Sequence, residues 1–130
     1  MAVTAPSLSR GTHRAITLSI ARDPGLVRTV RLVSAAVCRQ LMVKEKVVEQ
    51  ARLALGEAAA VMVAELTGEV GPVTVLLEPA DRLVATLSSP GRVDPDRSDP
   101  WILLRGLVGQ LSITESDGRT VVTMSWPLGR

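Results

Sequence analysis

The amino-acid sequence predicts an α+β domain, a two-layer sandwich in which helices cover one face of a mostly antiparallel sheet. Two observations predict this class. One alternating segment and two apolar helical segments come first, and two pairs of short strand-like segments, each joined by a turn, follow. Hairpins build antiparallel sheet, and amphipathic helices need one apolar surface to cover, so both layers share a core. The order of elements predicts one domain over residues 15–130.

Length and composition restrict the classes of protein. The chain has 130 residues, 46% hydrophobic and 22% charged, which is typical of one folded domain. The net charge is +2, and acidic and basic residues are interspersed along the chain. The sequence contains no Phe and no Tyr, and its two tryptophans are Trp101 and Trp126. Nucleic-acid binding is therefore not favoured, because a basic stripe and a base-stacking platform are both missing. The single Cys38 excludes an internal disulfide and a multi-thiolate zinc site.

Residues 1–14 mix Pro6, Gly11 and small polar residues without periodicity, which predicts a disordered tail. His13 lies in this tail without acidic or thiol neighbours, so we expect no metal or catalytic role for it. The chain has no apolar run of signal-peptide type, and no segment is long and apolar enough to span a bilayer. These features predict a cytoplasmic protein.

The first strand and the first helix follow this tail. Residues 15–20 alternate, with Ile16, Leu18 and Ile20 on one side, and predict a half-buried strand. Asp23-Pro24 predicts a helix start, because Asp caps free N–H groups and Pro at the first position gives up a donor that has no partner. The expected apolar face of this helix consists of Leu26, Val30, Val33, Val37 and Leu41.

The central packing element is the segment 47–66, the longest with helical periodicity. Its apolar positions recur at steps of three and four and so share one helix face. These positions are Val47, Ala51, Ala54 or Leu55, Ala58, Met62 and Leu66. Glu57 interrupts this alanine- and valine-rich run, and it is either a solvated residue on the outer face or a group with a function.

The second half of the chain contains the predicted hairpins. Strands at 73–77 and 83–88 are joined by a turn, and strands at 111–114 and 120–126 are joined by an Asp-Gly turn. Between the two hairpins, residues 89–100 hold three prolines and three aspartates and predict a loop, and residues 101–108 predict a short apolar helix.

This order resembles the GHKL domain, the histidine-kinase-like ATPase or Bergerat fold, over residues 15–126. It resembles more narrowly the bacterial anti-sigma factors of the serine-kinase type. The family carries E-x-x-x-N on its second helix, where Glu is the general base and Asn holds Mg²⁺ against the nucleotide phosphates. The matching segment here is 55–61, in which Glu57 is present and Val61 stands at the Asn position. A valine side chain has no lone pair for a metal.

Two further family motifs are altered. The Asp-x-Gly-x-Gly loop, which contacts adenine, matches 88–92, where a serine takes the Asp position and Gly91 remains as a remnant of the nucleotide loop. A glycine-rich phosphate-binding turn normally precedes the short helix, but residues 94–100 hold three aspartates, two prolines and no glycine. The resemblance therefore implies this fold with an ATP site that is degenerate, as in a pseudokinase.

Glu57, Arg28 and Arg31 are candidate functional residues, and each also has a purely structural interpretation. Glu57 is a solvent-facing helix residue, a vestigial or alternative catalytic base, or a carboxylate that bonds a backbone donor. Arg28 matches an arginine with which the resembled anti-sigma factors contact the sigma factor and its antagonist, although it is otherwise an ordinary exposed arginine. Arg31 is a near-equivalent candidate, because the alignment can slip by one turn. Cys38 is expected to be a small buried hydrophobe.

The resemblance implies a non-catalytic regulator of transcription in a partner-switching pathway. Such a protein binds a sigma factor, a STAS-domain anti-sigma antagonist, or both, and acts as a homodimer without a cofactor or metal. The alternative is an active ATP-dependent serine/threonine kinase that phosphorylates the antagonist, with Glu57 as base and ATP and Mg²⁺ bound. A basic nucleic-acid-binding module is a third and weaker interpretation.

Overall fold

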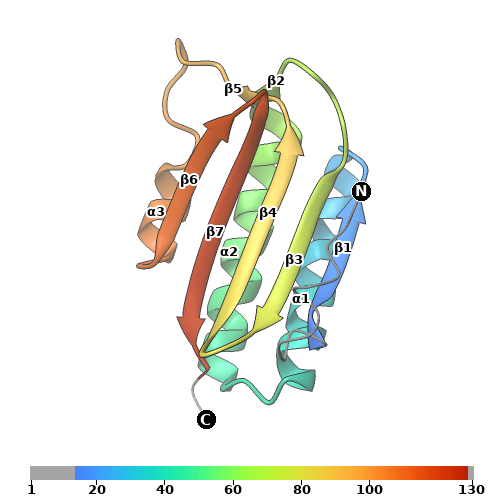
Figure 1. Ribbon diagram of the computed structural model, residues 1–130, viewed down its shortest axis with the longest axis vertical. Coiled ribbons are helices and arrows are strands. Elements are labelled where there is room, and N and C mark those ends of the chain that lie inside the picture. Colours follow the sequence, from blue (N-terminus) through green and yellow to red (C-terminus); the bar gives the residue numbers. More distant parts are fainter. Residues whose placement is uncertain (1–13, 129–130) are drawn as a thin grey trace.

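The computed structural model of the protein describes residues 14–128, so the predicted tail lies outside the described residues except for Arg14. Its elements are β1 (Ile16–Ile20), a 3₁₀ turn (Pro24–Leu26), α1 (Val27–Gln40), α2 (Glu45–Glu65), β2 (Leu66–Thr67), β3 (Val73–Pro79), β4 (Arg82–Pro90), β5 (Arg92–Val93), α3 (Ile102–Leu107), β6 (Leu111–Ser116) and β7 (Arg119–Pro127) (Figure 1). Each strand and helix predicted for this range is present.

The described chain forms a five-stranded sheet with the order β1-β3-β4-β7-β6, and every neighbouring pair in it is antiparallel. The three helices lie on one face of this sheet, with α2 across its middle and α1 and α3 on either side (Figure 1). The hairpins β3–β4 and β6–β7 are the two that the sequence predicts. The predicted α+β two-layer sandwich is confirmed.

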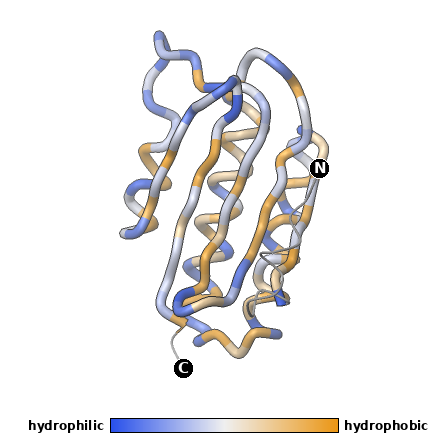
Figure 2. The backbone as a smooth tube through the Cα atoms, viewed as in Figure 1, coloured by the Kyte–Doolittle hydropathy of each residue, from blue (hydrophilic) through white to orange (hydrophobic). Residues whose placement is uncertain are grey.

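The core lies between α2 and the inner face of the sheet. Alternate residues of β3, β4 and β7 are buried, because successive strand side chains point to opposite faces. All the predicted apolar positions of α2 are buried, and Leu55 and Met62 are completely so. Figure 2 shows this pattern as alternating hydrophobic and hydrophilic positions along the strands and α2. The prediction of α2 as the central packing element is confirmed.

The buried face of α1 differs in part from the predicted face. Val30 and Leu41 are buried as expected, but Val33 and Val37 are only half-buried, and Ser34 and Cys38 are buried instead. The reason is that α1 packs more closely against α2 than against the sheet, which turns a neighbouring stripe of the helix inward. Burial raises the pKa of the Cys38 thiol to about 11, as fits the predicted buried hydrophobe.

Short-range backbone details complete the fold. The Asp23 side chain accepts a hydrogen bond from the Gly25 N–H (2.8 Å) and caps the 3₁₀ turn that leads into α1. Asp117 and Gly118 both have positive φ, 54° and 74°, as a type I′ hairpin turn requires. The small β2–β5 pair was not predicted, because strands of two residues have no detectable periodicity. Within residues 14–128, no helix is long and apolar enough to cross a bilayer.

Candidate functional site

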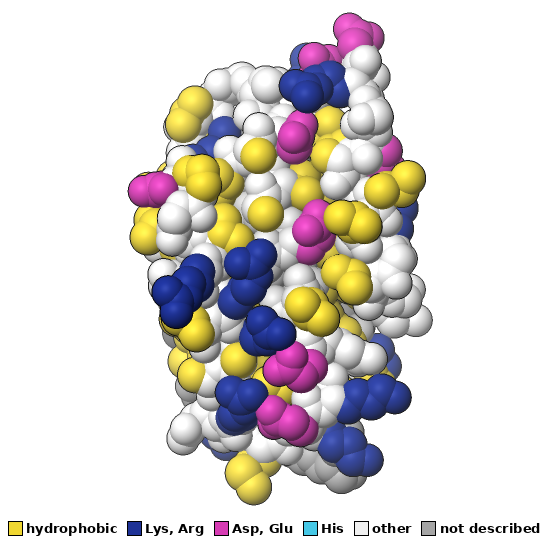
Figure 3. Space-filling model, turned by 180° about the vertical axis from the view of Figure 1, so that it is seen from behind, with side chains coloured by type: hydrophobic (Ala, Val, Ile, Leu, Met, Phe, Trp, Pro, Cys, Tyr) yellow, Lys and Arg dark blue, Asp and Glu magenta, His cyan; other side chains and the backbone are white. Residues whose placement is uncertain are grey.

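The outer face of α1 and α2 carries a group of basic side chains (Figure 3). Two of its arginines are held in ion pairs within the chain: Arg39 contacts Glu45 at 2.7 Å, and Arg52 contacts Glu49 at 2.8 Å. Hydrogen bonds from these arginines lower the pKa of both carboxyl groups. The charges of these two arginines are therefore compensated within the chain.

Arg28 and Arg31 lie higher on α1 and differ from this pattern. Arg28 is exposed and Arg31 is half-buried, and neither forms an ion pair with any residue in the range 14–128. The Arg31 side chain lies across α2 at Gly56, where a Cβ atom would collide with its stem. Gly56 thus lets the guanidinium rest against the neighbouring helix, and two uncompensated positive charges remain on this surface.

A groove of about 320 Å³ lies between α1 and α2 next to these charges. Its lining is apolar except for one guanidinium and consists of Pro24, Val27, Arg31, Ala60, Val63 and Ala64. A short apolar side chain fits such a groove, and a carboxylate beside it would reach Arg31. Of the two predicted partner-binding residues, Arg31 lines this groove, and Arg28 is an exposed residue that follows the lining residue Val27 on α1.

The two positions that match the family's E-x-x-x-N motif, Glu57 and Val61, have different surroundings. Glu57 is half-buried on the outer part of α2, and within residues 14–128 its carboxylate makes no hydrogen bond or ion pair. Val61 is 6% exposed and belongs to the hydrophobic core. The side chain at position 61 therefore contributes to packing, and no second polar group accompanies Glu57 at this spacing.

The Arg22 side chain makes hydrogen bonds to the segment that matches the family's adenine-contacting loop. This residue was not identified from the sequence. Its guanidinium donates to Ser89 Oγ (3.1 Å), to the Leu66 carbonyl (3.3 Å) and to the Pro90 carbonyl. Its Nε is buried and has no partner among the described residues. An isolated arginine after a strand carries no sequence signal for such a role, because its acceptors lie more than 40 residues away in the chain.

Gly91 has a structural role in the same cluster. Its φ is +102°, and a Cβ at this position would lie 2.9 Å from the Thr67 carbonyl and 3.1 Å from Arg22 Nη2. The Thr120 hydroxyl donates to the Gly91 carbonyl at 2.8 Å. Packing within the protein therefore accounts for glycine here, and its origin in a nucleotide loop stays a prediction.

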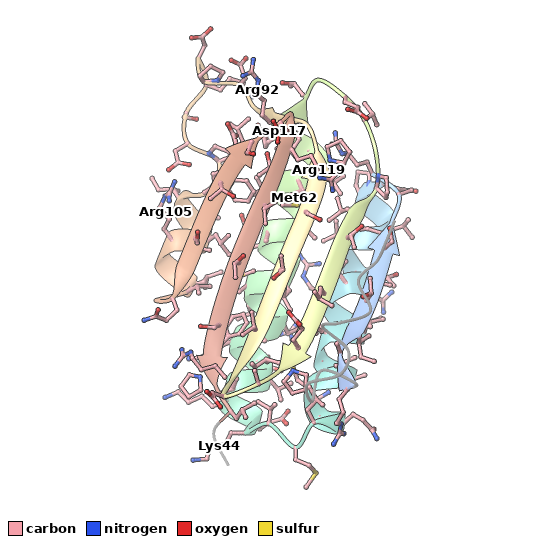
Figure 4. All side chains as sticks on the ribbon, in the orientation of Figure 1. Lys44, Met62, Arg92, Arg105, Asp117 and Arg119 are labelled. Carbon is pink, nitrogen blue, oxygen red and sulfur yellow. The ribbon has the colours of Figure 1, made fainter. Side chains whose placement is uncertain are left out.

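The loop before α3 is held by its own carboxylates. Asp94 accepts from the Asp96 N–H (2.9 Å), and Asp99 accepts from the Trp101 N–H (2.9 Å) and pairs with Arg105 (3.1 Å). Arg105 projects outward from α3 (Figure 4). A cavity of about 510 Å³ lies between this loop and β6, with charges of both signs on its walls. Among residues 14–128, no group of three or more His, Cys, Asp or Glu side chains is placed to hold a metal ion.

Comparisons with known proteins agree with the fold. The chain matches no protein-family model. No curated protein matches it either. Among solved structures, it is similar to the crystal structure of the RsbU and RsbW domains of Rv1364c from Mycobacterium tuberculosis, with 16% sequence identity and a TM-score of 0.75. The match covers 89% of this chain and 33% of that one, so it shows a shared fold with a part of the larger protein.

Proposed function

We propose that the protein is a non-catalytic regulator of the anti-sigma type that acts by binding other proteins. The observation that carries the proposal is the apolar groove of α1 and α2, which the Arg31 side chain lines without an ion-pair partner, together with the exposed Arg28 three residues earlier on α1. Similarity of fold to a structure that contains an RsbW domain supports an anti-sigma role in general. The partner would be a sigma factor, a STAS-domain antagonist, or both, in a partner-switching pathway.

The chemistry of the groove indicates what the partner offers. An acidic segment with one apolar side chain would place that side chain between the helices and its carboxylate against Arg28 or Arg31. Because arginine binds carboxylates with two parallel hydrogen bonds, such a contact is directional as well as attractive. Arginines in this setting are frequent among the residues that dominate interface energies.

The absence of catalysis is proposed from the three altered nucleotide positions. Val61 is packed in the core, and Arg22 makes the hydrogen bonds at Ser89 and Pro90. The loop 94–100 offers aspartates where a nucleotide needs backbone donors. We therefore expect no bound ATP or Mg²⁺ in the working protein.

The alternative is an active serine/threonine kinase, and the unpaired carboxylate of Glu57 is the observation in its favour. A base is effective only when the phosphoryl group is positioned beside it. Calorimetric titration with ATP and Mg²⁺ separates the two functions: the proposed regulator gives no heat of binding at about 100 μM nucleotide, whereas micromolar affinity would establish the kinase.

A homodimer belongs to the same proposal. The face of the sheet opposite the helices bears two rows of uncharged residues that cross all five strands. One row consists of Thr17, Leu76, Thr86, Thr123 and Ser112, and the other of Ser19, Thr74, Ser88, Val121 and Thr114. Strand spacing gives this face roughly 500 Å², so two copies packed face to face bury about 1,000 Å², which is about the least that a biological interface is expected to bury. The rows hold no charged side chain of their own, and the Arg119 guanidinium lies beside the second row, where it donates to Ser88 Oγ at 3.4 Å.

Partner identification and charge reversal test the proposal together. Affinity purification from the native host with the full chain as bait identifies the partner by mass spectrometry, and the affinity of the purified pair is then measured. Arg28→Glu is expected to weaken binding at least about tenfold, because it sets like charges against each other. Arg97→Glu, at another exposed arginine outside this face, is the matched control and is expected to bind as the wild type does. Equal affinities for the two variants would remove Arg28 from the interface.

A further inference from the structure

A second surface of the helical layer combines exposed apolar side chains with one acidic group. It consists of Leu53 and Glu57 on α2 and of Ile102, Leu103 and Leu107 on α3, and we call it the α2–α3 surface. The apolar side chains are 47%, 69%, 65% and 43% exposed for Leu53, Ile102, Leu103 and Leu107. Figure 3 shows hydrophobic side chains gathered over α3 and the adjoining part of α2, with an acidic side chain among them.

The exposure of α3 is unusual for a helix on the surface of a domain. Of its six residues only Leu104 is buried, while three large apolar side chains face solvent. A surface helix normally turns polar residues outward, and a contiguous exposed apolar patch marks an interaction site. Leu53 extends the patch onto α2, which packs directly against α3.

Glu57 gives this surface a negative charge, which indicates the charge that a binding partner must carry. It is the only charged residue between Arg52 and Glu65 of α2, and it lies four residues after Leu53 on the same helix face. The residue is half-buried, and its carboxylate has no hydrogen-bond or ion-pair partner among residues 14–128. An unpaired carboxylate beside exposed apolar side chains attracts a cation or hydrogen-bond donors of a partner molecule.

We propose that the α2–α3 surface binds an amphipathic α-helix of a partner protein, with apolar residues at helical spacing and a lysine or arginine that contacts Glu57. Apolar anchors from a helix at steps of three and four match two neighbouring helices of this kind. The surface is distinct from the Arg28 face and prefers the opposite charge. The inference does not depend on the proposed function, but together the two faces allow the chain to contact two different partners.

Other occupants fit less well. A second copy seated on the same surface would bring two Glu57 carboxylates close together in an apolar setting, and like charges there repel each other. An extended peptide binds through the free edge of a sheet, which the helical layer does not offer. Charge complementarity therefore selects a basic amphipathic helix.

Two synthetic helical peptides test the inference. One presents leucines at i, i+4 and i+7 with a lysine in the middle of this stripe, and its twin has glutamate in place of the lysine. Each is titrated into the ¹⁵N-labelled full chain and followed by NMR. The lysine peptide is expected to shift amide signals of Leu53, Glu57 and Leu103 saturably, and to bind about tenfold more tightly than its twin.

Three variants complete the test. Leu103→Ser is expected to weaken binding of the lysine peptide about tenfold, because an apolar anchor is lost. Glu57→Gln is expected to remove the preference for lysine over glutamate. Leu32→Ser, at a leucine on α1 that is 59% exposed, is the matched control and is expected to bind normally.

Several outcomes would overturn the inference. These are no saturable shift up to about 1 mM peptide, equal affinity for both peptides, shifts confined to other elements, or a Glu57→Gln variant that keeps the preference for lysine. Sedimentation that shows self-association of the wild type and its loss in Leu103→Ser would assign the surface to a second copy instead. The Arg28→Glu variant is expected to bind the lysine peptide like the wild type, so failure here and failure of the proposed function are distinguishable.

Discussion

Removing the guanidinium of Arg22 is expected to destabilise the protein by about 2 kcal/mol. In Arg22→Met the apolar stem is kept, while the carbonyls of Leu66 and Pro90 and the Ser89 hydroxyl lose their donor. A hydrogen bond from a charged donor contributes about 1.5–3 kcal/mol in mutational series. The net loss is smaller than three such bonds, because Arg22 is half-buried and its Nε is buried without a partner.

Urea unfolding followed by tryptophan fluorescence measures this loss. Trp101 and Trp126 are 4% and 5% exposed, so both report on loss of the core. The midpoint is expected to fall while the slope with urea stays constant, since the same surface is exposed on unfolding. For a chain of this size the melting temperature is expected to fall by about 6 °C.

The controls separate the hydrogen bonds from the charge. Arg97→Met removes an exposed guanidinium that makes no such contacts within residues 14–128, and it is expected to change stability by less than about 0.5 kcal/mol. Arg22→Lys keeps the charge but has a compact ammonium group that reaches fewer acceptors, so its loss is expected to lie between these values. A loss for Arg22→Met as small as that of the Arg97 control would refute the reasoning.

Three other predictions concern α1, α2 and the open face of the sheet. Gly56→Leu is expected to displace the Arg31 side chain and to weaken binding of the acidic partner about threefold to tenfold, as measured by calorimetry. Binding of the lysine peptide, followed by NMR, is expected to persist. Unchanged affinity for the acidic partner would exclude Arg31 from the contact. The Cys38 thiol, buried and with a pKa of about 11, is expected to react with a disulfide reagent at pH 8 at least about 100-fold more slowly in the folded protein than in urea, and equal rates would contradict its burial. Thr123→Arg is expected to convert the proposed dimer to a monomer in sedimentation, because it places a charge in the uncharged rows, and a persistent dimer would place the interface elsewhere.

The elements with a strong local pattern were predictable from the sequence. The repeat of apolar residues in α2 has one orientation that buries all of them, and Asp117-Gly118 supplies the positive φ values of a tight hairpin. The order of the strands was not predictable in this way. β1 pairs with β3, and β7 pairs with β4, through contacts between distant residues that no local pattern specifies.

The candidate site shows the same division. Arg28 and Arg31 were predicted from their place on the first helix, and the structure places Arg31 in the lining of a groove, although the role of both residues in binding stays a prediction. Arg22 was missed because its acceptors belong to segments brought together only by folding. The exposure of Ile102 and Leu103 was also missed, since an apolar segment of six residues reads equally well as a buried helix.

The position of β7 affects how the sheet assembles during synthesis. This last strand lies between β4 and β6, in the interior of the sheet, and pairs with β4 along its whole length from Arg82–Pro127 to Pro90–Arg119. Until residues 119–127 leave the ribosome, β4 has an unpaired edge and α2 has no complete surface to cover. A nascent chain halted before residue 119 is therefore expected to be prone to association through that edge.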